Sequence, residues 1–180
     1  MLPSGVISVA CDVDMPRHWP VLPRVGLRVL LAGSFTSLEW FGRGPHENYP
    51  DRKESAPVRH YSSTVADQLP PYIRPGECGS KTDVRWLQLT TPPPPPLPPT
   101  TPAHPNGGAG FSFSALAHLP EDLASAGHPE DLVSRPFTAV SLDHCLMGVG
   151  GDDSWSACVH DEYLVRPGRY SFSFTMAAHW

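Results

Sequence analysis

Alternation of bulky apolar residues with small or polar ones constrains the fold of this chain more than any other feature. In residues 7–13 the apolar positions are Ile7, Val9, Cys11 and Val13. Residues two apart lie on the same face of a strand, so this pattern is typical of a half-buried antiparallel strand. The same alternation recurs at 25–31, 111–114 and 170–176. Weaker strand candidates are 37–41, 84–89, 137–142 and 159–165.

Clusters rich in glycine and proline separate these candidate strands. They lie at 42–45, 74–76, 148–153 and 166–169, and such clusters mark turns. Helical signals are short, because residues 120–123 and 128–132 each offer only a proline followed by two acidic residues. That combination suits a single first turn of a helix. Short strands divided by turns predict an all-β fold, an antiparallel sandwich of roughly eight or more strands.

A proline-rich tract interrupts an otherwise ordinary domain. The chain has 180 residues, 23 of them proline, and its length suits one sandwich domain over residues 1–180. Residues 91–110 read TPPPPPLPPTTPAHPNGGAG, and proline cannot donate the hydrogen bonds of a strand ladder. We expect an exposed polyproline II loop inserted as an extended hairpin connection between strands. It is either a tolerated insertion or a ligand for SH3 or WW domains.

The charge balance and the hydropathy pattern exclude two classes of partner. Lys and Arg number 13 against 18 Asp and Glu, for a net charge of −5, which does not suit a basic nucleic-acid binder. No apolar stretch approaches the ~20 residues that a membrane-spanning helix needs. The first residues lack the basic region of a secretory signal. The four cysteines are widely spaced, so we expect reduced thiols.

No catalytic motif stands out among the chemically reactive residues. Acidic residues occur as adjacent pairs (121–122, 130–131, 152–153 and 161–162), and strand neighbours point to opposite faces rather than converging on a substrate. His144, Cys145, Cys158 and His160 lack the spacing of a zinc motif. Ser154 is not part of a nucleophile elbow, and its loop has no phosphate-binding lysine.

The segment 147–155, MGVGGDDSW, is the most informative part of the sequence. Its three glycines permit positive φ and close backbone approach, and Asp153 and Ser154 are suited to hydrogen-bond local amides in a turn. The segment ends in Trp155, whose ring is suited to stack on the C–H face of a sugar. From the residues alone, a tryptophan that plugs the end of the sandwich is an equal alternative.

A second dense segment, 40–52, mixes aromatic, charged and turn residues. Arg43 or Arg52 is expected to pair with Glu47 or Asp51, since guanidinium and carboxylate form strong two-pronged hydrogen bonds. Such a network favours locking of a long loop against a sheet edge over contact with a ligand.

Five stretches together resemble the C-terminal β-sandwich domain of large β-galactosidases of glycoside hydrolase family 2. They are WFGRGPHENYPDRK, YSSTVADQLPPYIRPGECGSKTDVRWL, FSFSAL, LDHCLMGVGGDDSWSACVHDEYLV and RYSFSF. Their order and spacing match the family from about residue 25 to residue 174. The resemblance implies a galactose-mutarotase-like supersandwich, in agreement with the alternation described above.

The resemblance also implies how the work is divided within a longer enzyme. The two catalytic glutamates of the family lie in a barrel domain that this chain does not contain, so no catalytic residue is expected here. Trp155 is implied to contact the galactoside, with its loop supported by Gly150, Gly151, Asp152, Asp153 and Ser154. The family's Mg²⁺ and Na⁺ sites lie in other domains, so no metal or cofactor is expected in this chain. The implied partners are the galactoside, the catalytic barrel and other subunits in the cytoplasm, without nucleic acid or membrane.

Three departures from the family pattern leave alternatives open. Cys78 stands where the family commonly has asparagine, the proline tract replaces a short connection, and the first strands of the family domain are expected to be missing. The main expectation is a non-catalytic part of an enzyme that hydrolyses terminal β-D-galactose from β-galactosides such as lactose. A stand-alone carbohydrate-binding or mutarotase-like module, and an interaction protein that uses the proline tract, are the alternatives.

Overall fold

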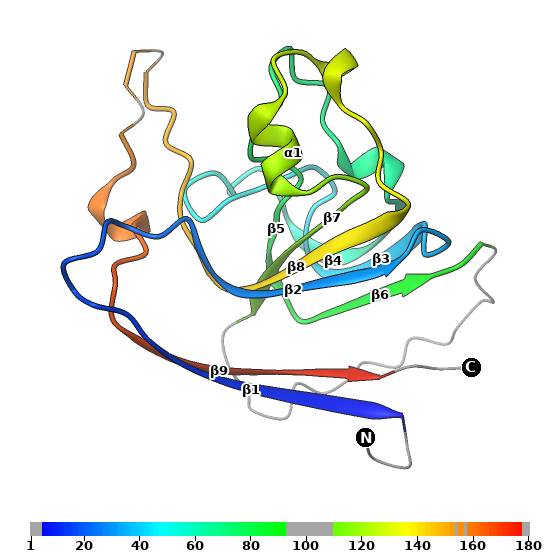
Figure 1. Cartoon of the computed structure of the whole chain (residues 1–180), viewed down its shortest axis with the longest axis horizontal. Coiled ribbons are helices and arrows are strands. Elements are labelled where there is room, and N and C mark those ends of the chain that lie inside the picture. Colours follow the sequence, from blue (N-terminus) through cyan, green and yellow to red (C-terminus); the bar gives the residue numbers. More distant parts are fainter. Residues whose placement is uncertain (1–4, 93–109, 154, 157, 178–180) are drawn as a thin grey trace.

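The chain folds into an all-β sandwich, which confirms the predicted fold class (Figure 1). The computed structural model describes residues 5–92, 110–153, 155–156 and 158–177. The strands are β1 (Val6–Asp14), β2 (Arg24–Ala32), β3 (Ser37–Arg43), β4 (Val58–Thr64), β5 (Lys81–Val84), β6 (Trp86–Thr90), β7 (Phe111–Leu116), β8 (Phe137–Leu146) and β9 (Arg169–Ala177). Short helical turns are η1 (Ala66–Gln68), α1 (Pro120–Ser125), η2 (Pro129–Asp131) and η3 (Asp161–Tyr163).

Three antiparallel sheets contribute to the main core. The order is β2-β8-β7-β5 in the largest sheet, β4-β3-β6 in the second and β1-β9 in a two-stranded ribbon. The ribbon runs along the lower side of the molecule in Figure 1. Each sheet contributes to the core: Trp40 comes from β3, Phe113 from β7 and Phe174 from β9. The rings of Trp40 and Phe113 meet edge to face with centroids 5.8 Å apart, a favourable aromatic geometry.

The β1-β9 ribbon confirms the strands predicted from the alternation at 7–13 and 170–176. Val9 and Cys11 pair with Phe174 and Phe172 across β1 and β9, so the apolar positions of both strands fall on one face. That face packs on the core through Phe174, whose ring meets Phe111 at 5.7 Å between centroids. The apolar period of two therefore specifies the pairing register as well as the strand.

The predicted strand at 84–89 is two strands in two different sheets. Arg85 separates β5 from β6, and its amide donates to the carbonyl of Phe41 at 2.8 Å. Asp83, two residues before Arg85, has a positive φ of 52°, a conformation that aspartate tolerates better than most residues. The chain therefore turns from the large sheet into the second sheet within a single residue.

One further predicted strand does not form, and one strand of the structure was not predicted. Residues 159–165 form the turn η3 with one isolated bridge, between Leu22 and Val165, rather than a strand. β4 has no counterpart among the predicted strands because it is an edge strand whose residues are half-buried or exposed. The two short helical segments are confirmed as α1 and η2.

The connection that carries the proline tract joins two sheets and is not a hairpin. β6 pairs with β3, whereas β7 pairs with β5 and β8. The tract's expected polyproline II conformation concerns residues 93–109, which lie outside the described part of the chain. Among the described residues no helix is long and apolar enough to cross a membrane.

Candidate functional site

The loop that follows β8 is held at its first residues by backbone bonds to two other segments. The amide of Met147 donates to the carbonyl of Pro23 at 2.9 Å, and the amide of Gly148 donates to the carbonyl of Tyr163 at 2.9 Å. Gly148 is buried, and a Cβ there would stand 2.4 Å from Oδ2 of Asp51. Only glycine fits this close approach, which brings two distant segments together.

Trp155 is presented to solvent by this loop. Its side chain is 91% exposed, so it does not plug the sandwich. Asp153 fixes the backbone beneath the ring, because its Oδ1 accepts the amides of Trp155 at 2.8 Å and Ser156 at 2.7 Å. These amide bonds lower the pKa of Asp153. Ser154 lies outside the described residues.

The other residues expected to support the loop are Gly150, Gly151 and Asp152. The two glycines allow the backbone conformation, and Asp152 joins the two arms of the loop. Gly150 has φ +72°, and a Cβ there would lie 2.6 Å from the carbonyl oxygen of Cys158. Gly151 has φ +114° with open space around it, so its conformation rather than its size favours glycine. Asp152 forms an ion pair with His160 across the loop. The hydrogen bond that the His160 imidazole donates to the Asp152 carboxylate raises the pKa of that imidazole.

The segment 40–52 is locked by ion pairs, though not all of those expected. Arg52 pairs with Glu47 as predicted. Arg43 pairs instead with Asp83 at 2.6 Å, a residue outside the segment. Asp51 accepts two backbone amides of the Trp155 loop, from Val149 at 3.1 Å and from Gly150 at 2.7 Å. The segment therefore positions the loop as well as bracing the sheet.

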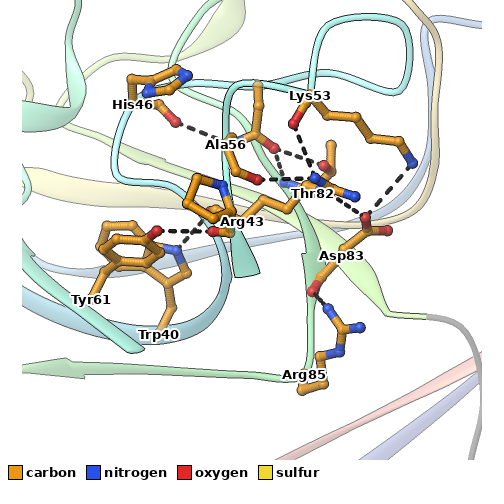
Figure 2. Close-up of polar contacts among 11 residues, drawn as sticks. Trp40, Arg43, His46, Lys53, Ala56, Tyr61, Thr82, Asp83 and Arg85 are labelled. Atoms are coloured by element: carbon orange, nitrogen blue, oxygen red, sulfur yellow. Dashed lines mark hydrogen bonds and ion pairs between the residues drawn. The ribbon is translucent and has the colours of Figure 1, made fainter. Parts of the chain in front are cut away.

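Arg43 is the centre of the bracing network (Figure 2). Its Nη1 donates to the carbonyls of Lys53 and Ala56, both at 3.0 Å, while its Nε donates to Asp83. The backbone carbonyl of Arg43 accepts the indole N–H of Trp40 at 3.0 Å. One guanidinium thus holds the far end of segment 44–56 against β5, because its donors form a rigid fork.

A cavity of about 450 Å³ is lined in part by Glu47 and Arg52 of this segment. Its lining includes Glu47, Arg52, Gln68, Tyr72 and Lys81. Lys81 is 2% exposed, and its Nζ donates to Oε1 of Gln68 at 2.9 Å. Burial lowers the pKa of Lys81 to about 8. Sequence analysis did not single out this cavity, and the one available signal was a lysine in a chain that has only two, Lys53 and Lys81.

A partly buried charge cluster joins β2 and β8 to Glu77. Arg24 bridges Asp143 at 3.1 Å and Glu77, and Tyr49 donates to Glu77 at 3.4 Å. Burial raises the pKa of Asp143 to about 7 although the Arg24 charge opposes this shift. Cys78, next to Glu77, is buried with Leu116 and Leu123. Its thiol packs as a small apolar group, and burial raises its pKa to about 12.

In three of the four acidic pairs at least one member forms an ion pair with a separate cation. Ion pairs join Asp122 to Arg135, Glu121 to Arg28, Asp152 to His160 and Asp161 to Arg166. Cys11, Cys78, Cys145 and Cys158 carry free thiols. In the part of the chain that the structure describes, no group of three or more His, Cys, Asp or Glu side chains gathers around a possible metal position.

Comparison with known proteins identifies similar sequences over nearly the whole chain. The family model described as the β-galactosidase small chain matches residues 1–176. A β-galactosidase of Vibrio cholerae is 41% identical over 170 residues, which cover 94% of this chain and 15% of that protein. A β-galactosidase of Priestia megaterium is 37% identical over 182 residues, covering 96% of this chain and 16% of that protein. The chain therefore spans about one sixth of the length of these relatives.

Proposed function

The chain belongs to the β-galactosidase small-chain family, and from that premise we propose that it is the sugar-contacting, non-catalytic part of a β-galactosidase. In this role Trp155 stacks on the terminal β-D-galactose of a β-galactoside such as lactose. Bond cleavage belongs to a separate catalytic barrel. The observation that carries the proposal is the exposed indole held on an anchored loop.

The chemistry of the ring supports a carbohydrate contact. A large aromatic side chain left in water forgoes the stabilisation of roughly 1.5–3 kcal/mol that burial of a bulky apolar side chain brings. Trp155 is 91% exposed, and its loop is braced by Asp153 and by the Asp152–His160 pair. Its ring is therefore available to be covered by a ligand. Sugar C–H faces suit an indole because they are apolar yet bordered by hydroxyls.

The state of the carboxylates supports the non-catalytic part of the proposal. Retaining glycosidases need two carboxyl groups ~5 Å apart across the scissile bond. In three of the four adjacent acidic pairs at least one carboxylate is instead engaged with a cation, such as Asp122 with Arg135 and Asp161 with Arg166. Because the relatives are about six times longer, we assign the catalytic partner to the remainder of such a protein, in the cytoplasm.

Titration with methyl β-D-galactopyranoside tests the sugar contact. One aromatic stack contributes about 0.5–1.5 kcal/mol, so we expect weak but saturable binding at high millimolar sugar, seen as a change in tryptophan emission. Trp155→Ala is expected to abolish the change. The matched control is Trp19→Phe, since Trp19 is the other strongly exposed tryptophan among the described residues, at 50%, and the change should persist in it.

Two results would contradict the proposal. A sugar response that survives in Trp155→Ala would place the contact elsewhere, and a flat wild-type titration would remove the contact from this chain. Hydrolysis of a chromogenic β-galactoside by the purified chain at an enzyme-like rate would show that the non-catalytic assignment is wrong.

A further inference from the structure

Asp51 joins the segment between β3 and β4 to the loop that carries Trp155. Its two carboxylate oxygens divide between two successive amides, with Oδ1 on Val149 at 3.1 Å and Oδ2 on Gly150 at 2.7 Å. Such bonds are charge-assisted and about twice as strong as neutral ones. The two segments are 98 and 99 residues apart in sequence, so this is a long-range tertiary contact.

The Asp51 end of this contact is held on both sides. The turn around it closes by two backbone bonds, from Tyr49 to Arg52 at 3.1 Å and from Arg52 to Tyr49 at 2.9 Å. Tyr49 is 1% exposed. Asn48 is fully buried, and its Oδ1 accepts the amide of Thr82 at 2.8 Å. The backbone that carries the Asp51 carboxylate is thus fixed by its neighbours.

The loop end of the contact is the point where the backbone departs from the sheet. Gly148 has no room for a Cβ because the Asp51 carboxylate occupies that space. Gly150 and Gly151 follow with positive φ, and glycine has the greatest freedom at such values. Gly148 keeps its amide bond to the carbonyl of Tyr163, so without the Asp51 acceptor the loop would be freer to swing from Val149 onward and would carry Trp155 with it.

We propose that Asp51 is a positioning residue, whose carboxylate fixes the segment 148–150 and thereby sets the orientation in which Trp155 meets a β-galactoside. The inference rests on the proposed function for the identity of the ligand. The Asp51 contact to the loop backbone is independent of it.

The test combines two variants with a control in the full chain labelled with 5-fluorotryptophan. Asp51→Ala removes both acceptor oxygens, whereas Asp51→Asn keeps one and preserves the shape. Asp161→Ala is the matched control, because Asp161 is a carboxylate of the same loop that pairs with Arg166 at 3.2 Å. The readouts are amide exchange at Val149 and Gly150, the ¹⁹F resonance of Trp155 (assigned by its loss in Trp155→Phe), and that resonance's response to methyl β-D-galactopyranoside.

In Asp51→Ala we expect both amides to exchange at least ~10-fold faster, since a hydrogen bond to a charged acceptor is lost. The Trp155 resonance should move towards its value in the unfolded chain. If the productive orientation falls to about one fifth of the population, the sugar dissociation constant rises about fivefold. Asp51→Asn should protect one of the two amides and give intermediate values, and Asp161→Ala should match the wild type.

The outcomes separate this inference from the proposed function. Unchanged amide exchange, or an unchanged Trp155 resonance despite faster exchange, would overturn the positioning role. In the isosteric Asp51→Asn, loss of amide protection, of the Trp155 shift and of the sugar response, together with a lowered urea midpoint, would show that Asp51 acts on general stability. That result would also overturn the positioning role. A wild-type resonance that ignores the galactoside would refute the sugar contact, while the exchange rates and the sugar-free resonance would still decide the role of Asp51.

Discussion

Replacement of Arg43 by methionine is expected to destabilise the chain more than any single surface change. The guanidinium makes three hydrogen bonds, to Asp83 and to the carbonyls of Lys53 and Ala56, and its side chain is 21% exposed. Hydrogen bonds to charged groups contribute about 1.5–3 kcal/mol each, and bonds that share one group are not additive. We therefore expect a loss of about 3 kcal/mol in the free energy of unfolding.

Urea denaturation followed by tryptophan fluorescence measures this loss. With a slope near 2 kcal/mol per molar urea, the midpoint should fall by about 1.5 M. Arg43→Lys should lose about half as much, because an ammonium keeps the charge but not the fork. The control is Arg59→Met, since Arg59 lies exposed on β4, and it should stay within about 0.5 kcal/mol of the wild type.

A double-mutant cycle with Asp83→Asn separates the ion pair from the carbonyl bonds. Asparagine tolerates the positive φ of Asp83 as well as aspartate does, so this change removes charge without straining the backbone. We expect a coupling energy of about 1–2 kcal/mol between the two sites. A loss below about 1 kcal/mol in Arg43→Met, equal to that of Arg59→Met, would refute the view that Arg43 braces the segment.

Three further changes test the buried lysine, the loop approach and the core. Because burial lowers the pKa of Lys81 to about 8 from ~10.4 in the unfolded chain, the folded chain loses this proton first. Urea midpoints should therefore show wild-type stability rising relative to Lys81→Met between about pH 8 and 10, by at most about 1.4 kcal/mol per pH unit. Gly148→Ala places a Cβ 2.4 Å from Oδ2 of Asp51 and should cost about 1–3 kcal/mol in thermal unfolding; Gly168→Ala, with open space around it, should cost far less. Phe113→Ala, at a fully buried position, should cost about 3–5 kcal/mol in urea, and a change no larger than that of the exposed Ile73→Ala would contradict its place in the core.

The sequence predicts a strand correctly where one local pattern determines both its buried face and its pairing. The alternation of 7–13 and 170–176 fixes both a face and a register, and the structure pairs these segments as β1 and β9. It fails at β4, because an edge strand with one half-buried aromatic, Tyr61, carries little periodic signal. It fails at Arg85 because the exit from one sheet into another depends on the backbone of Asp83.

The candidate site divides in the same way. Asp153 acts within two or three residues of itself, so turn chemistry alone could suggest its contacts. Arg43 was expected to find a carboxylate close by in sequence, yet it pairs with Asp83, 40 residues away. The hydrogen bond that the Gly150 amide donates to Asp51 spans 99 residues. A contact between residues so far apart cannot be predicted from local sequence patterns.

The β1-β9 ribbon has a consequence for the order in which the chain folds. Its facing hydroxyls on Ser8 and Thr175 are 167 residues apart in sequence, so its pairing has very high contact order. Closing a loop of that length costs roughly 2.5 kcal/mol more entropy than closing a ten-residue hairpin. During synthesis β1 emerges first but must wait for β9, which reaches it only after the other sheets have had time to form. The ribbon is therefore expected to close last and to be the first element lost when unfolding begins.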